Sequence, residues 1–366
     1  MTTTDTASDA SPADARPVGV PSADVPFHVE RWSGSSLAAA AAGIAAVIVL
    51  ASAPAWAGGG TMKLLVEFFT ILALAQMWNL LAGYAGLVSI GQQAFVGLGA
   101  YALYVGADRL AWHPVAAVLL AGAFCGLVSL ATAAFAFRLR DGYFAIGTWV
   151  IAEVFRILVS NSAQVGAGTG VSLRSVNTIP LAERQSITYW VALAVGVGSV
   201  LVVAAMMRST LGLRLRAVRD AEVAARGLGV DVLRTRLVVY VVAAAVCGLA
   251  GAAAYLQLLR IQPSAAFSVD WTVGMIFIVV IGGLGRIEGP IVGAIVYFLL
   301  QEWLAPLGSL YLVVLGGVAI AVTLLAPRGL WGTFEARLPV RLFEYERRLV
   351  VDPDAAAPSP ARSGGD

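Results

Sequence analysis

An apolar run interrupted by glycines, residues 83–101 (GYAGLVSIGQQAFVGLGAY), constrains this chain more than any other feature. It contains five glycines and the polar residues Ser89, Gln92 and Gln93, but no charge. A helix in water rarely concentrates glycine, because each one costs about 1 kcal/mol of helix propensity. In a bilayer, glycines let helices approach closely and permit breaks that are lined by protein. The run therefore indicates membrane helices that pack closely, line a translocation path, or do both.

Composition is typical of a polytopic membrane protein. Only 13% of its 366 residues are charged and 59% are hydrophobic, whereas soluble domains carry about 25% charged residues. Several uncharged stretches approach or exceed the roughly 20 residues that cross the hydrocarbon core. Lys63 is the sole lysine and follows Met62, so no Gly-Lys-Ser/Thr nucleotide loop is present. The two cysteines lie in apolar stretches, which predicts two buried small side chains and no metal site.

Hydropathy predicts an all-α polytopic protein with about ten transmembrane segments and glycine-rich broken helices. The segments are 37–57, 64–82, 84–105, 114–137, 143–160, 189–207, 237–259, 270–285, 289–304 and 310–325. Arginines gather at 138–140, 208–236 and 328–348. Basic loops stay in the cytoplasm, so both termini are expected there. Glycine in 84–105 and 270–304 leaves open whether these stretches cross fully or form half-helices.

The predicted organisation has three parts. Residues 1–36 form a disordered cytoplasmic tail, 37–333 a permease domain with a cytoplasmic loop at 208–236, and 334–366 a largely disordered cytoplasmic tail. Both ends are rich in small residues and proline, a composition that buries too little apolar surface to fold alone.

Polar and glycine residues in two runs are candidates for the translocation path. The second run, residues 282–293 (GGLGRIEGPIVG), breaks two apolar segments and alternatively forms a simple turn. The candidates are Asn79, Gly83, Gly86, Ser89, Gln92, Gln93, Gly97, Gly282, Gly283 and Gly285.

Two charges lie inside the apolar segment 143–160. Glu153 and Arg156 are three residues apart, which places them on one helix face. A charge at the helix centre costs about 2.5–3.5 kcal/mol on insertion scales. We expect a structural ion pair, with a proton relay or a substrate contact as the alternative.

The basic loop 209–236 (STLGLRLRAVRDAEVAARGLGVDVLRTR) contains a helix-compatible stretch from Arg219 to Arg226. Gly227 and Gly229 are suited to ending that helix. The loop either rests on anionic lipid as a basic amphipathic segment or docks a cytoplasmic partner.

Five strings in this order resemble permease subunits of bacterial branched-chain amino-acid ABC transporters, in particular the LivM-type subunit. They are NLLAGYAGLVSIGQQAFVGLGAYA, DGYFAIGTWVIAEVFR, AVRDAEVAARGLGV, VVIGGLGRIEGPIVGA and LLAPRGLWG. The resemblance covers about residues 60–333. It implies a multi-pass protein of the bacterial cell membrane that is not an enzyme and carries no cofactor, because ATP binds to a partner subunit.

The resemblance also implies partners and a docking site. The partners are a second, LivH-type permease, two cytoplasmic ATPase subunits, an extracytoplasmic binding protein and membrane lipid, with no nucleic acid. The loop resembles an ATPase-coupling segment, although Val223 stands where the pattern has glutamate. Its coupling candidates are Arg219, Asp220, Ala224, Ala225 and Gly229. Transport of urea or short amides, or proton-coupled transport through Glu153 and Arg156, are the alternatives.

Overall fold

The computed structural model describes residues 27–30, 34–139, 142–304, 310–337 and 348–351. These residues fall into two units, which are described separately. In the smaller unit, strand β1 (Phe27–Glu30) pairs antiparallel with β4 (Arg348–Val351), so that Phe27 lies opposite Val351. Most of the two predicted tails lies outside the described residues.

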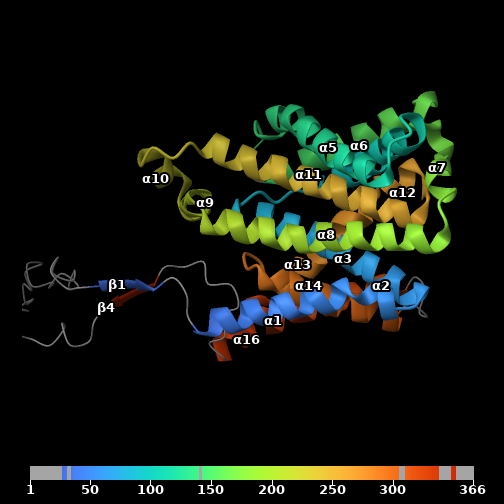
Figure 1. The fold of residues 1–366 in the computed structure, drawn as a ribbon. Helices are drawn as coiled ribbons and strands as arrows, with labels where there is room; N and C mark the ends of the chain where they lie inside the picture. The colour runs from blue at the N-terminus through green and yellow to red at the C-terminus, as the bar shows by residue number, and fades with distance from the viewer. Residues whose placement is uncertain (1–26, 31–33, 140–141, 305–309, 338–347, 352–366) are drawn as a thin grey trace, which may run out of the picture. The chain divides into compact units, whose positions relative to one another are not determined.

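The larger unit is a helical bundle (Figure 1). Its α-helices are α1 (Gly34–Ala51), α2 (Ala53–Trp56), α3 (Gly59–Asn79), α4 (Gln93–Tyr104), α5 (Pro114–Ala136), α6 (Gly142–Ser160), α7 (Arg174–Asn177), α8 (Leu181–Arg208), α9 (Thr210–Asp220), α10 (Glu222–Gly227), α11 (Val232–Leu258), α12 (Pro263–Ala266), α13 (Asp270–Gly282), α14 (Glu288–Leu304), α15 (Leu310–Leu325) and α16 (Gly329–Arg337).

Short elements complete the larger unit. Two π-helices, η2 (Leu80–Tyr84) and η3 (Val105–Arg109), extend α3 and α4. Two 3₁₀ turns, η4 (Ala163–Val165) and η5 (Ala167–Thr169), precede strand β2 (Val171–Ser172), which pairs antiparallel with β3 (Arg260–Ile261).

Helices α3 and α11 form the centre of the bundle. Helix α3 contacts α8, α11, α13 and α14, while α11 also contacts α4, α5 and α8. Glycines allow the closest of these approaches. A Cβ at Gly99 of α4 would lie 2.2 Å from the carbonyl oxygen of Gly248 on α11, and one at Gly251 would lie 2.3 Å from that of Val96. Small residues on facing helices are the usual means of close packing in membranes.

Seven helical stretches among the described residues have the length and hydropathy of membrane spans. They are Gly59–Tyr84, Pro114–Ala136, Gly142–Ser160, Leu181–Arg208, Val232–Leu258, Pro263–Gly282 and Val313–Arg337. The protein is therefore an all-α polytopic membrane protein. The segments predicted at 143–160 and 310–325 agree with α6 and α15 to within one residue.

Helical structure does not begin at the start of the predicted segment 84–105, whose glycines had left its continuity open. The π-helix η2 ends at Tyr84, and the chain regains helical structure only at Gln93. Between them, side chains from neighbouring helices bind the backbone: the indole Nε1 of Trp78 donates to the Ser89 carbonyl (2.9 Å), and the amide of Ile90 donates to Thr148 Oγ1 (3.2 Å). Non-helical backbone at membrane depth is tolerated where protein surrounds it in this way.

The basic loop also differs from its predicted form. The stretch from Arg219 to Arg226 is divided at Ala221, whose non-helical backbone (φ −155°, ψ 84°) ends α9 and begins α10. Gly229 has φ +82° just after α10, which confirms that glycine ends this helix. Helices α9 and α10 lie at one end of the bundle, and α7 and α12 lie at the opposite end (Figure 1).

Candidate translocation and coupling site

The two glycine runs meet where α3 ends. Asn79 binds the loop between α13 and α14 with both groups of its amide: Nδ2 donates to the Arg286 carbonyl, and Oδ1 accepts from the Gly285 amide, each at 2.8 Å. One turn earlier, Gln76 Nε2 donates to the Ile287 carbonyl at 2.8 Å. We call this contact between the end of α3 and residues 282–287 the glycine junction.

Arg219 of α9 joins the glycine junction from the basic loop. Its Nη1 donates to the Gly83 carbonyl at 2.8 Å. The same nitrogen lies 3.1 Å from where a Cβ would stand on Gly285. Its Nε donates to Asp220 at 3.2 Å. A side chain of the candidate coupling loop therefore contacts both glycine runs that the sequence analysis had treated separately.

Backbone approach explains why glycine occupies the junction. A Cβ on Gly83 would lie 2.5 Å from Asn79 Oδ1, and one on Gly282 would lie 1.8 Å from the Gly289 carbonyl oxygen. Gly283 and Gly285 have φ of +127° and +75°, a conformation that side-chain-bearing residues rarely adopt. The junction is thus a close backbone-to-backbone contact that larger residues would separate.

The polar residues of the first run bind one another and α13 inside the bundle. Gln92 Nε2 donates to Ser89 Oγ at 3.2 Å, and the Gln93 amide donates to Thr272 Oγ1 at 3.3 Å. All four side chains are buried. Gly91 lies directly on α6, since a Cβ there would be 2.1 Å from the Thr148 carbonyl oxygen. Ser89, Gln92 and Gln93 thus lie within helix packing in this structure.

The remaining path candidates of the first run lie apart from one another. A Cβ on Gly97 would lie 2.6 Å from the ring of Phe267. Gly86 has φ +67° with open space around it, and it borders a hollow of about 950 Å³ together with Glu222 and Arg226 of α10.

Glu153 and Arg156 form the predicted ion pair within α6. Arg156 Nε donates to both carboxylate oxygens of Glu153, at 2.8 and 2.9 Å. The pair is only partly covered by this chain: the Glu153 side chain is 45% exposed and that of Arg156 35%. The two charges therefore neutralise each other on a face of α6 that this chain leaves partly open.

The other loop candidates have contrasting environments. Ala225 is buried against Val218 and Val232, whereas Ala224 is exposed. Glu222 fixes α10 by ion pairs to Arg226 (2.6 Å) and Arg236 (3.0 Å). Val223, the residue that departs from the family pattern, is 86% exposed.

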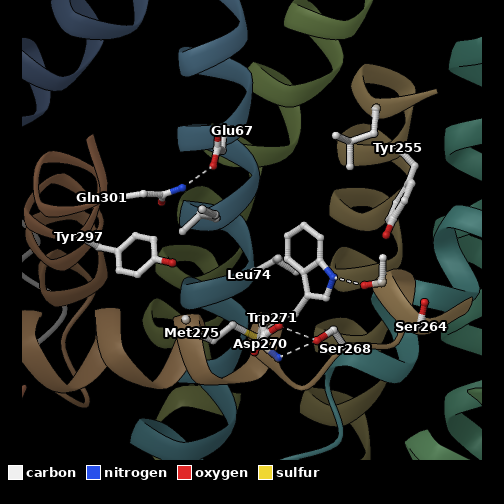
Figure 2. A pocket seen from close by; sticks show the side chains of 14 residues that line it. Glu67, Leu74, Tyr255, Ser264, Ser268, Asp270, Trp271, Met275, Tyr297 and Gln301 are labelled. Atoms are coloured by element: carbon white, nitrogen blue, oxygen red, sulfur yellow. Dashed lines mark hydrogen bonds between the residues drawn. The ribbon is translucent and has the colours of Figure 1, made fainter. Parts of the chain in front are cut away.

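A cavity of about 510 Å³ at the α12 end of the bundle contains charged residues that sequence reasoning missed. Figure 2 shows Glu67 of α3 beside Gln301 of α14, and Asp270 beside Ser268 at another side of the cavity. Glu67 lies inside the predicted segment 64–82, and a charge within a membrane segment is costly there as it is at Glu153. Its partner Gln301 is 234 positions away in the chain, and no sequence pattern links the two.

Comparison with known proteins identifies the family. A profile of the branched-chain amino acid transport system permease component matches residues 60–323. The chain belongs to this permease family. The matched residues include the glycine junction, the ion pair of α6, the α9–α10 loop and the cavity.

Curated relatives of the permease family agree with this assignment. The high-affinity branched-chain amino acid transport system permease protein LivM of Escherichia coli K12 is 26% identical over 321 residues, covering 78% of this chain and 74% of its own length. LivM of Salmonella typhimurium LT2 is 26% identical over 319 residues (78% and 73%). The probable LivM of Methanocaldococcus jannaschii is 25% identical over 166 residues (45% and 48%). No solved structure matches significantly.

Membership of the permease family gives the class of the protein. It is an ABC importer permease of the LivM type, a transport subunit and not an enzyme, and a multi-pass protein of the bacterial inner membrane. Within the described residues, no three side chains of histidine, cysteine, aspartate or glutamate gather as metal ligands. Cys125 and Cys247 are both free and buried, as predicted.

Proposed function

We propose that this permease carries branched-chain amino acids across the membrane, and that ATP hydrolysis by separate subunits drives the transport. The observation that supports this most strongly is the bond from Arg219 to the Gly83 carbonyl. It connects a loop outside the membrane spans to the ends of α3 and α13. Movement of that loop by an ATPase would therefore act on the centre of the bundle.

We further propose ten membrane crossings with both termini in the cytoplasm. Three further crossings add to the seven long spans. They are α1, α4 together with η3, and α14. Residues 93–109 and 288–304 each extend about 25 Å at a rise of 1.5 Å per residue, close to the roughly 30 Å of the hydrocarbon core. The non-helical residues 85–92 lengthen the first of these crossings. The basic loop then lies in the cytoplasm, as the positive-inside rule requires.

The partner assignments follow from this topology. Helix α10 presents Val223 and, just beyond its end, Leu228, both more than four-fifths exposed, beside the salt-bridged Glu222. Exposed apolar side chains on a short charged helix suit docking into a protein groove. We assign this surface to one of two cytoplasmic ATPase subunits. A second permease, LivH-type, and an extracytoplasmic binding protein complete the importer.

Reconstitution tests the proposal. The permease, its partner permease, the ATPases and the binding protein in proteoliposomes should accumulate leucine when ATP is inside the compartment that the ATPases face. Omission of the ATPases should abolish accumulation. Accumulation of leucine driven by a proton gradient alone would contradict the proposed energy source. Saturable uptake of urea that leucine does not inhibit would contradict the proposed substrate.

The docking surface is tested separately. Val223→Asp should reduce co-purification of the ATPase, because it places a charge in an apolar contact. The matched control is Leu181→Asp, an exposed aliphatic residue at the opposite end of the bundle. Equal ATPase binding by both variants would favour the alternative that the loop rests on anionic lipid.

A further inference from the structure

The cavity at the α12 end combines an apolar wall with uncompensated negative charge. Ile71 and Leu74 of α3 and Met275 of α13 form part of its apolar wall. Leu74 and Met275 are labelled in Figure 2. Its volume of about 510 Å³ falls within the roughly 300–1,000 Å³ of small-molecule sites. The cavity lies at the end of the bundle opposite α9 and α10, which under the proposed topology is the extracytoplasmic end.

Glu67 and Asp270 are the acidic side chains of this lining. Glu67 Oε1 accepts from Gln301 Nε2 at 2.9 Å, and Asp270 Oδ2 accepts from Ser268 Oγ at 2.8 Å. Within the part of the chain that the structure describes, neither carboxylate has an ion-pair partner. Lys63, one turn before Glu67, instead borders a different hollow together with Arg184. Glu67 is half-buried and Asp270 is exposed. Two carboxylates at one cavity attract a cation, and the described chain does not provide one.

An unused hydrogen-bond acceptor lies beside Glu67. The side-chain oxygen of Gln301 has no hydrogen-bond donor in the structure. Rotating the amide to exchange its oxygen and nitrogen would direct that oxygen at the Glu67 carboxylate, so the observed orientation is favoured. The indole of Trp271 already donates to the Ala265 carbonyl at 3.1 Å. A ligand that fits here brings several N–H donors and a positive charge.

We propose that this cavity is a substrate site, in which Glu67 and Gln301 bind the α-ammonium group of an aliphatic amino acid and Ile71, Leu74 and Met275 contact its side chain. An ammonium group supplies three donors and one positive charge. Urea and short amides carry no positive charge and leave Glu67 uncompensated. The proposal rests on the proposed function and deepens it, because it assigns a cationic amine rather than a neutral amide as the recognised group.

Cysteine labelling of the assembled importer tests the site. Ser264 is exposed and borders the cavity, while both native cysteines are buried. Ser264→Cys should react faster with a positively charged methanethiosulfonate than with a negatively charged one, and leucine should slow the reaction. Ala182→Cys, exposed at the same end but outside the cavity lining, should show neither effect.

Adding Glu67→Gln to Ser264→Cys should raise the leucine concentration needed for half-protection by about tenfold, the effect of losing one charge-assisted hydrogen bond. Glu302→Gln, next to Gln301 but outside the cavity lining, is the matched control and should leave this concentration unchanged. If the Glu67→Gln importer does not assemble, the test is whether leucine protects Ser264→Cys from labelling in the otherwise unchanged importer. An importer that accumulates leucine with ATP yet shows no protection overturns the site and leaves the proposed function standing. An importer without ATP-driven leucine uptake contradicts the function itself.

Discussion

Charged side chains have ion-pair partners at one end of helix α3 and lack them at the other, within the residues that the structure describes. At the Asn79 end, Arg219 binds the Gly83 carbonyl and Asp220, and Arg286 pairs with Glu335 of α16. At the other end, Glu67 has only a neutral amide as partner. The same helix thus contributes to a contact in which charges are neutralised within the protein, and to a cavity in which charge is left for something else to neutralise.

This difference separates a structural joint from a binding site. Charges that pair within a protein hold its elements in register, whereas a charge without a partner raises the free energy of the empty state and favours a ligand of opposite sign. Helix α3 is well suited to connect the two, because it is packed inside the bundle much more completely than α6. The comparison assigns coupling to the glycine junction and substrate recognition to the cavity.

The largest expected effect is at the junction itself. Gly282→Ala should prevent accumulation of folded protein, because the added Cβ would lie 1.8 Å from the Gly289 carbonyl oxygen. Overpacking of this kind typically costs about 1–3 kcal/mol or more. Yield and thermal stability in detergent are the measurements. Gly316→Ala, in open space on α15, is the control and should be neutral; equal yields for the two variants would show that the junction is not close-packed.

A smaller loss is expected from Asn79→Leu. The change leaves the Gly285 amide and the Arg286 carbonyl without their partner, and an unsatisfied buried group costs about 1–3 kcal/mol. Asn79→Asp keeps the acceptor for Gly285 and should retain more stability than the leucine variant. Thermal unfolding of both in detergent makes the comparison. Greater stability of the leucine variant would mean that the amide does not hold the loop.

The ion pair of α6 is a third case, in which two charges neutralise each other on a partly exposed helix face. Glu153→Ala and Arg156→Ala should each lower the yield of folded protein, because each leaves one charge unpaired inside a membrane span, at a cost of up to about 3 kcal/mol. The double variant should recover part of the loss. A Glu153→Gln protein that expresses normally but is inactive in transport would instead assign Glu153 a role in proton movement.

The sequence predicted many of the helices but not the contacts between residues that are far apart in the chain. Apolar stretches located α6 and α15, and the spacing of Glu153 and Arg156 predicted their pair, because both features depend on local sequence. The break over the non-helical residues 85–92 could not be located, because glycine fits both a packed helix and a helix break. The convergence of Arg219 with Gly83 was missed because the two are 136 positions apart, and only the packing of α9 against η2 brings them together.

Uptake kinetics of the reconstituted importer test the division of roles along α3 most directly. Arg219→Ala should lower the maximal rate of leucine uptake about tenfold at an unchanged KM, whereas Glu67→Gln should raise KM at a nearly unchanged maximal rate. Arg214→Ala, exposed on the same helix as Arg219, and Glu302→Gln are the matched controls and should leave both constants unchanged. The opposite pattern, or the same change in both variants, would contradict the assignment of coupling to one end of α3 and recognition to the other.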